Sequence, residues 1–145
     1  MIDVWTDGSC LGNPGAGGAA AISSNFAVCH GDSATTNNAM EITAVIIALE
    51  KCLASGRLEV TIHTDSTYVK NGIEKWAANW EKNGWKTASG QNVKNQVGWK
   101  RLRELEKKML NLQWKWVKGH SGNPGNEKAD SLARGTAELF GELNK

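Results

Sequence analysis

The stretches IDVWTDGS (residues 2–9) and VTIHTDST (residues 60–67) are built alike. In each, β-branched and aromatic residues lead to a Thr-Asp pair that turn-forming residues follow, which predicts a β-strand that ends at a turn. A right-handed crossover through an intervening helix would let the two strands pair in parallel. Ligands of open α/β sheets bind beyond the carboxyl ends of such strands, so we expect Asp7 and Asp65 to be neighbours there.

The periodicity of apolar residues predicts the other elements around these two strands. The small residues 17–23 and the run 26–30 flank Ser24-Asn25 as a hairpin. The order β-β-β-α-β-α-β-α indicates a mixed α/β sheet with helices on its faces and, without any linker, a single domain. The remaining expected elements are a helix at 38–54 capped by Thr36, Asn37 or Asn38, a strand at 58–64, helices at 66–83 broken near Gly72, a helix at 98–110, a strand at 112–117 and a last helix through Ala137.

Composition excludes several classes of protein. At 145 residues and 40% hydrophobic content, the chain can bury one ordinary core without disulfides or a structural metal. Its three cysteines are an odd number without C-x-x-C spacing, which argues against a disulfide framework and a zinc knuckle and fits a reducing compartment. No stretch approaches the roughly 20 apolar residues of a membrane span, and the first residues do not resemble a signal peptide. We therefore expect a cytoplasmic protein that binds no membrane.

Charge is distributed unevenly along the chain. Residues 70–118 carry 12 Lys and Arg against 4 Asp and Glu, whereas the other residues carry 5 against 11. Trp76, Trp80, Trp85 and Trp99 lie within the basic block. Such a block can be the solvated face of helices, but basic and aromatic residues together suit phosphates and sugars. The pattern favours a nucleic-acid surface joined to an acidic site.

Four acidic residues are candidates for a metal site. Carboxylates as close as we expect for Asp7 and Asp65 need a cation between them, and oxygen ligands without Cys or His select Mg²⁺ or Mn²⁺. Glu41 is expected in the first turn of the helix at 38–54, and Asp130 in the second turn of the last helix. Each residue also has an ordinary structural explanation, as a turn or cap residue, a partner of the helix dipole or part of a solvated helix face.

Five segments resemble the successive motifs of bacterial type 1 ribonucleases H, in that family's order and across nearly the whole chain. They are TDGSCLGNPG (6–15), TNNAME (36–41), TDS (64–66), WVKGHSG (116–122) and NEKAD (126–130). The resemblance implies a five-stranded mixed sheet of order 3-2-1-4-5 flanked by helices, in one ribonuclease H domain spanning residues 1–145. It implies a monomeric endoribonuclease that hydrolyses the RNA strand of RNA/DNA hybrids and leaves 5′-phosphate and 3′-hydroxyl ends.

The resemblance also implies roles for individual residues. Asp7, Glu41, Asp65 and Asp130 become the catalytic ligands of two Mg²⁺ ions, with Mn²⁺ as an alternative, and such metal pairs lie about 4 Å apart. His120 becomes a residue of proton transfer or product release, although a lone loop histidine is more often ordinary surface. His30 and His63 fall within strands and are expected to be structural.

Two sets of residues are implied to bind the hybrid. Along the minor groove, the resemblance places Cys10, Asn13, Asn37, Asn38 and Asn126, whose alternative roles include turn and cap residues. On a basic protrusion that grips the DNA strand, it places Trp76, Trp80, Trp85, Lys82, Lys86 and Lys94. Core packing is the competing role for Trp76 and Trp80, which are four residues apart.

The chain departs from its relatives at the protrusion, where many of them carry more lysine. Here the residues are Glu81, Asn83, Ser89, Gly90 and Gln91, so we expect weaker affinity for the hybrid. Thr67 stands where relatives often carry glutamine, which puts that groove contact in doubt. Two alternatives remain: another nuclease of this architecture, such as a resolvase or integrase-like domain, or a silent hybrid-binding module. The latter would be expected to lack one of the four carboxylates.

Overall fold

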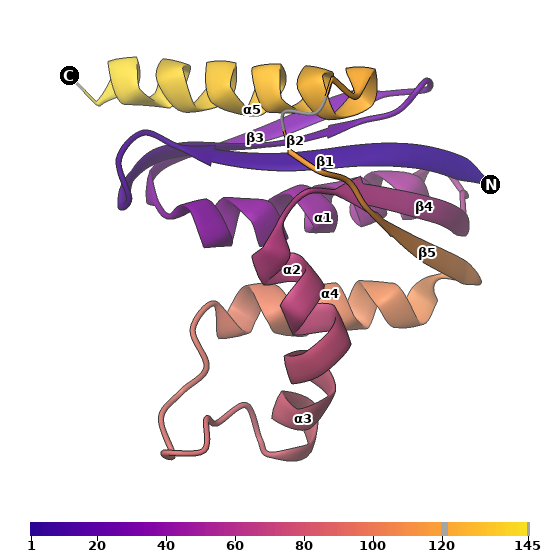
Figure 1. Cartoon of the computed structure of the whole chain (residues 1–145), viewed down its shortest axis with the longest axis vertical. Coiled ribbons are helices and arrows are strands. Elements are labelled where there is room, and N and C mark those ends of the chain that lie inside the picture. Colours follow the sequence, from indigo (N-terminus) through magenta and orange to yellow (C-terminus); the bar gives the residue numbers. More distant parts are fainter. Residues whose placement is uncertain (120–121, 145) are drawn as a thin grey trace.

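A computed structural model of the chain describes residues 1–119 and 122–144 and contains one five-stranded sheet (Figure 1). The strand order β3-β2-β1-β4-β5 confirms the order that the family resemblance implies. The central strand β1 pairs antiparallel with β2 and parallel with β4, and β4 pairs parallel with β5. The strands are β1 (Ile2–Cys10), β2 (Gly15–Ile22), β3 (Ala27–Thr35), β4 (Glu59–Thr64) and β5 (Asn111–Trp116).

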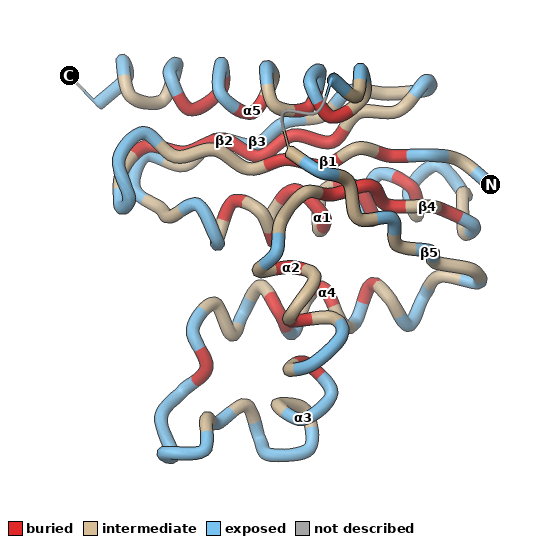
Figure 2. The backbone as a smooth tube through the Cα atoms, in the orientation of Figure 1, coloured by how far each residue is buried: buried red, intermediate tan, exposed pale blue. Residues whose placement is uncertain are grey.

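Helices cover both faces of the sheet, as the sequence predicts (Figure 1). α1 (Asn37–Ala54) packs on one face and α4 (Gln96–Lys108) packs against α1, and the main apolar core lies between these helices and the sheet. α5 (Pro124–Leu143) covers the other face over β2, β1 and β3. Figure 2 shows buried residues along the central strands and on the helix sides that face them.

α5 approaches the sheet closely because small residues line the contact. A Cβ at Gly18 of β2 would lie 2.3 Å from the carbonyl oxygen of Ala133, so this strand position admits no side chain. Ala129, Ala133 and Ala137 are fully buried on the facing side of α5. Close packing of backbones through small residues therefore fixes α5, and any functional group that it carries, against the sheet.

Residues 67–95, which we call the protrusion, lie on the α1 side of the sheet and contain the first part of the basic block 70–118 (Figure 1). It contains α2 (Thr67–Asn71), the single π-helical turn η1 (Gly72–Trp76), α3 (Ala77–Lys82) and the loop that leads to α4. The expected break near Gly72 is wrong, because the chain stays helical there. A Cβ at Gly72 would lie 2.0 Å from the ring of Trp99, so glycine is required by a close approach and does not end the helix.

Other boundaries differ from the prediction where tertiary contacts extend an element. β1 continues past Thr6 to Cys10 because β2 supplies antiparallel partners up to the pair of Cys10 with Gly17. β2 begins at Gly15, two residues before the expected run 17–23, and β3 continues to Thr35, beyond the expected run 26–30. α5 passes Ala137 and ends at Leu143, and α4 begins at Gln96, two residues early. Within residues 1–119 and 122–144, no helix is long and apolar enough to cross a membrane.

Candidate active site

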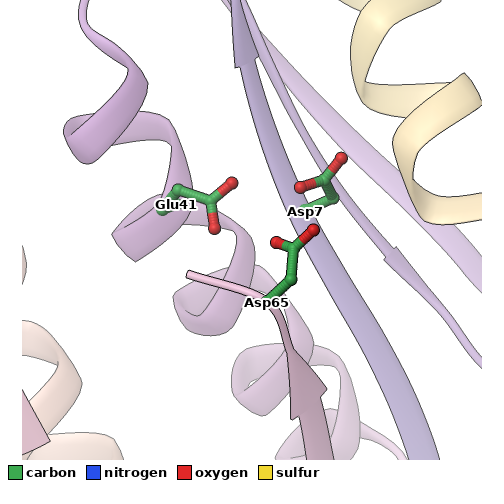
Figure 3. A group of neighbouring side chains, drawn as sticks. All are labelled: Asp7, Glu41 and Asp65. Atoms are coloured by element: carbon green, nitrogen blue, oxygen red, sulfur yellow. The ribbon is translucent and has the colours of Figure 1, made fainter. Parts of the chain in front are cut away.

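Three carboxylates from separate elements converge at one edge of the sheet (Figure 3). Asp7 lies on β1, Glu41 on α1 and Asp65 directly after β4, and the three side chains point into a common space. One carboxylate oxygen of each residue lies within 4.8 Å of those of the other two. Such a group of hard oxygen donors can hold a divalent cation.

The parallel pairing of β1 and β4 brings Asp7 level with Asp65. Trp5 pairs with His63, and two residues farther along each strand are the two aspartates. Asp65 follows the last residue of β4, as predicted, but Asp7 lies inside β1 and not at its end. Its neighbour on the other side is Ala20 of β2. Asp7 therefore sits on the continuous central strand, beyond the point where β4 stops.

Glu41 is held toward the aspartates by the backbone of β1. The N–H of Gly8 donates a hydrogen bond of 2.6 Å to Oε1 of Glu41. Oε2 of Glu41 is buried and, within the part of the chain that the structure describes, has no hydrogen-bond partner. The expected place of Glu41 in the first helical turn is wrong, because Thr36 caps α1 and Asn37 begins it, which puts Glu41 in the second turn. One oxygen of Glu41 is thus oriented, and the other is left for a ligand.

Burial and mutual repulsion make the three-carboxylate cluster costly to ionise. Burial first, and then the charges of Glu41 and Asp65, raise the pKa of Asp7 from 3.8 to about 10. Burial likewise raises the pKa of Glu41 from 4.5 to about 7, although the hydrogen bond from Gly8 acts in the opposite direction. Without a counter-charge the cluster retains protons, and a bound cation would replace them.

Asp130 approaches from α5 but does not join the group of three. Its side chain pairs with Arg134 one turn later, with Oδ2 at 3.3 Å from Nη2. Burial is the main cause of the raised pKa of Asp7, and Asp130 adds a smaller contribution. Asp130 lies in the second turn of α5, as predicted.

The candidate minor-groove residues divide into two places. Asn13 accepts a hydrogen bond of 3.2 Å from the backbone N–H of Asn37, so the loop after β1 lies against the start of α1. Cys10 lies beside them, where its thiol donates to the carbonyl of Thr35 over 3.4 Å. Thr36 caps the helix, which leaves the side chains of Asn37 and Asn38 exposed at its first turn. Asn126 is different, because it is almost fully buried on α5.

The tryptophans of the protrusion take part in both packing and a surface cavity. The Trp80 ring lies 5.8 Å from the ring of Trp99 and 5.7 Å from that of Trp76. Trp76 and Trp80 also line a cavity of about 350 Å³, together with Asn38, Thr87 and Lys94. Both residues therefore pack on neighbouring rings and also line a surface cavity. Trp85 is half-buried against the core cluster, and Trp99, within the basic block, is fully buried in that cluster.

The candidate lysines of the protrusion are exposed. Lys94 borders the cavity, and Nζ of Lys86 lies 2.5 Å from Oδ1 of Asn92 across the loop. Lys82 is the last residue of α3. His120 lies outside the described residues. The preceding Gly119 is close to the site, since a Cβ there would lie 2.9 Å from Oδ2 of Asp65.

The sequence reasoning did not identify the backbone groups that shape the site. The sequence pattern places Gly8 only in a turn. In the structure the N–H of Gly8 orients Glu41, and Gly119 leaves room for the side chain of Asp65. Nothing in the local sequence marks these contacts, because each glycine is defined by a residue more than 30 positions away. The alternation of Trp5 and Asp7 on β1 could have shown that they share one face of the strand.

The chain is similar to known proteins over almost its whole length. The model of the RNase H family matches residues 1–138. A ribonuclease H of Hyphomonas neptunium is 49% identical over 146 residues, which cover 97% of this chain and 95% of that protein. A ribonuclease H of Francisella tularensis subsp. novicida is also 49% identical, covering 97% and 94%. The crystal structure of LC9-RNase H1, a type 1 RNase H with the type 2 active-site motif, superposes with a TM-score of 0.83 at 32% identity, covering 96% of this chain and 72% of that one.

Proposed function

Because the chain belongs to the ribonuclease H family, we propose that Asp7, Glu41, Asp65 and Asp130 bind two Mg²⁺ ions for hydrolysis of the RNA strand of an RNA/DNA hybrid. Membership of the family supports endoribonuclease activity on RNA/DNA hybrids. The metal ligands, the number of ions and the product ends are proposed in addition. The observation that carries it is the convergence of three carboxylates, from three separate elements, within 4.8 Å.

The donor set fits such ions. All candidate ligands are carboxylate oxygens, which Mg²⁺ prefers, and the buried Oε2 of Glu41 would gain a partner. The pKa values of Asp7 and Glu41 are raised, first by burial, so a nearby positive charge would stabilise their ionised forms. When bound, a pair of divalent cations supplies an activated water and stabilises the charge on the leaving oxygen. Mn²⁺ would satisfy the same ligands.

The protein's own groups position the reactants. The Gly8 amide holds Glu41 in place, and the close packing of α5 keeps Asp130 beside Asp7. In-line displacement with departure of the ribose 3′ oxygen leaves a 5′-phosphate and a 3′-hydroxyl. We propose that His120 assists proton transfer or product release, a role that rests on its motif alone.

The surface around the site suits a hybrid duplex. Cys10, Asn13, Asn37 and Asn38 border the start of α1, and we propose that they contact the minor groove together with Asn126. Trp76, Trp80, Trp85, Lys82, Lys86 and Lys94 would contact the DNA strand, with aromatic faces and positive charge in reach of sugars and phosphates. We further propose that residues 1–145 form one domain that acts as a monomer. Its three free cysteines fit a cytoplasmic location.

One set of reactions tests the proposal. Labelled RNA/DNA hybrid, single-stranded RNA and duplex RNA are incubated with the protein and Mg²⁺, with Asp7→Asn as the control variant. We expect cleavage of the hybrid alone, loss of cleavage in EDTA and in Asp7→Asn, and 3′-labelled products that carry a new 5′-phosphate removable by phosphatase. Cleavage of all three substrates, or full activity of Asp7→Asn, would contradict the proposed site.

A further inference from the structure

An aromatic pair lies one strand repeat behind the aspartates. Trp5 of β1 pairs in register with His63 of β4, and their rings stack with centroids 4.4 Å apart and planes 17° apart. Asp7 follows two residues after Trp5 on β1, and Asp65 follows two residues after His63, directly after β4. Because side chains alternate along a strand, Trp5 shares a face of the sheet with Asp7.

A carboxylate holds the imidazole of His63 in place. Nε2 of His63 lies 2.8 Å from Oδ1 of Asp3, which precedes Trp5 by two residues on β1. His63 is only 7% exposed, whereas the side chain of Asp3 reaches solvent. The imidazole therefore has one anchored nitrogen and one face covered by the indole, so its orientation is set from two sides.

The first turn of α5 rests on the indole of Trp5. Gly125, the second residue of α5, has no space for a side chain, since a Cβ there would lie 2.3 Å from Cδ2 of Trp5. The clash would be with the fused atoms of a ring that His63 supports from its stacked position, and not with the end of a flexible chain. The Trp5 ring thus limits how closely the start of α5 approaches the sheet.

The same turn of helix leads directly to Asp130. Asn126 follows Gly125 and is 3% exposed, and Asp130 lies four residues after Asn126 on the same side of α5. A helix rises 1.5 Å per residue along a stiff axis, so a shift of its first turn moves Asp130 with it. α5 packs against β1, the strand that carries Asp7.

Stability alone does not explain the choice of these two rings. Nε1 of Trp5 and Nδ1 of His63 are both buried, and among the residues that the structure describes neither has a hydrogen-bond partner. A buried polar atom without a partner is unfavourable for folding. A phenylalanine at position 5 would cover the same helix turn without that penalty. If the two stacked rings place Asp130, that role would account for their presence despite the unfavourable buried nitrogens.

We propose that Trp5 and His63 are positioning residues, which seat the first turn of α5 so that the carboxylate of Asp130 faces those of Asp7 and Asp65. The inference rests on the proposed function, because it takes Asp130 as a metal ligand. Neither ring touches substrate or metal in this account, and both act through Gly125 and the axis of α5.

The test compares Trp5→Ala, Trp5→Phe and Gly125→Ala in the full chain. Two quantities are measured for each variant: the Mg²⁺ concentration that gives half-maximal cleavage of the hybrid, and the affinity of the substrate-free protein for Mg²⁺ by calorimetry. We expect Trp5→Ala and Gly125→Ala to weaken Mg²⁺ binding on the order of tenfold, as changes behind metal ligands do. The KM for the hybrid at saturating Mg²⁺ should stay unchanged. Trp5→Phe retains a ring under the helix and should retain the affinity.

The matched control is Gly135→Ala, which also adds a methyl group to α5 but at a position with no atom within 4 Å of it. Alanine suits a helix better than glycine at both sites, so only the clash with Trp5 separates the two variants. Lower melting temperatures with unchanged Mg²⁺ affinity would show that the stack is structural only and would overturn the inference. Should Trp5→Ala fail to fold, Gly125→Ala decides the question.

Asp130→Asn distinguishes a failure of the proposed metal site from a failure of the proposed positioning role. If this variant binds Mg²⁺ as tightly as the wild type, the proposed ligand role of Asp130 is wrong, and the positioning role falls with it. If Asp130→Asn weakens binding while the Trp5 and Gly125 variants do not, only the positioning role is wrong and the proposed metal site stands.

Discussion

The backbone N–H of Gly8 donates to Oε1 of Glu41 over 2.6 Å, and this contact joins the central strand to the helix behind it at the centre of the candidate site. It requires glycine at position 8. A Cβ there would lie 2.5 Å from the backbone nitrogen of Glu41, far inside van der Waals contact. The strand and the helix could not both keep their places around a larger residue.

Gly8→Ala should therefore lower both stability and activity. Overpacking of a tight contact costs about 1–3 kcal/mol, and the displaced Glu41 should reduce hybrid cleavage more than the loss of folded protein explains. Denaturant unfolding and steady-state cleavage rates measure the two effects. Gly135→Ala is the control, for which we expect a gain of about 0.5–1 kcal/mol because glycine disfavours helix interiors. Equal behaviour of the two variants would contradict the close contact.

The stability of the metal-free protein should fall as the pH rises from about 4 toward 10. In the folded state burial, with the neighbouring charges, raises the pKa of Asp7 to about 10, and burial raises the pKa of Glu41 to about 7. Unfolded, both groups titrate near 4, so above that pH the folded state binds more protons and loses stability with each step upward. Each unit of difference in pKa corresponds to about 1.4 kcal/mol.

Unfolding in EDTA at several pH values measures this effect. Asp7→Asn should be no more stable than the wild type at pH 4 and increasingly more stable above it, and Mg²⁺ should stabilise the wild type at neutral pH. Glu104→Gln, at an exposed position of α4, is the control and should not reproduce the trend. A wild-type stability that rises steadily with pH in EDTA would count against repulsion within the carboxylate cluster.

Added charge on the protrusion should strengthen hybrid binding. Gln91 is exposed, and Gln91→Lys adds a cation to the loop that also carries Lys86 and Lys94. One new phosphate contact should steepen the dependence of log K on log salt by about 0.9. A salt titration of Kd with catalytically inactive Asp7→Asn as background measures it. Ser55→Lys, after the far end of α1, carries the same charge and should leave the slope unchanged.

Trp76 and Trp80 should respond differently to truncation. Trp80 contacts the rings of Trp76, Trp85 and Trp99, so Trp80→Ala should destabilise the fold by about 3 kcal/mol. Trp76 borders the cavity and packs on fewer rings, and Trp76→Ala should mainly weaken hybrid binding, by about 1–3 kcal/mol. Unfolding curves and Kd values separate the two effects. Equal losses of stability would mean that Trp76 serves packing alone.

Local patterns were sufficient for the elements and for two of the carboxylates. β-Branched and aromatic residues at 2–6 and alternation at 58–64 predict the strands. Helical spacing at 38–54 predicts α1, because this periodicity follows directly from backbone geometry. The twin Thr-Asp pairs pointed to Asp7 and Asp65, which the structure brings together. Boundaries were less accurate, because β1 and α5 are extended by partners distant in the sequence.

The strands and helices, their order and the presence of an acidic edge follow from the sequence alone. Periodicity and turn residues act over a few positions, and five ordered motifs identify the family. The contact of Glu41 with the Gly8 amide, the place of Asp130 outside the group of three, and the contact of Trp5 with Gly125 of α5 are seen only in the folded protein. These relationships depend on the close approach of backbones from separate elements. Distances of a few tenths of an ångström decide such contacts, and no local pattern encodes them.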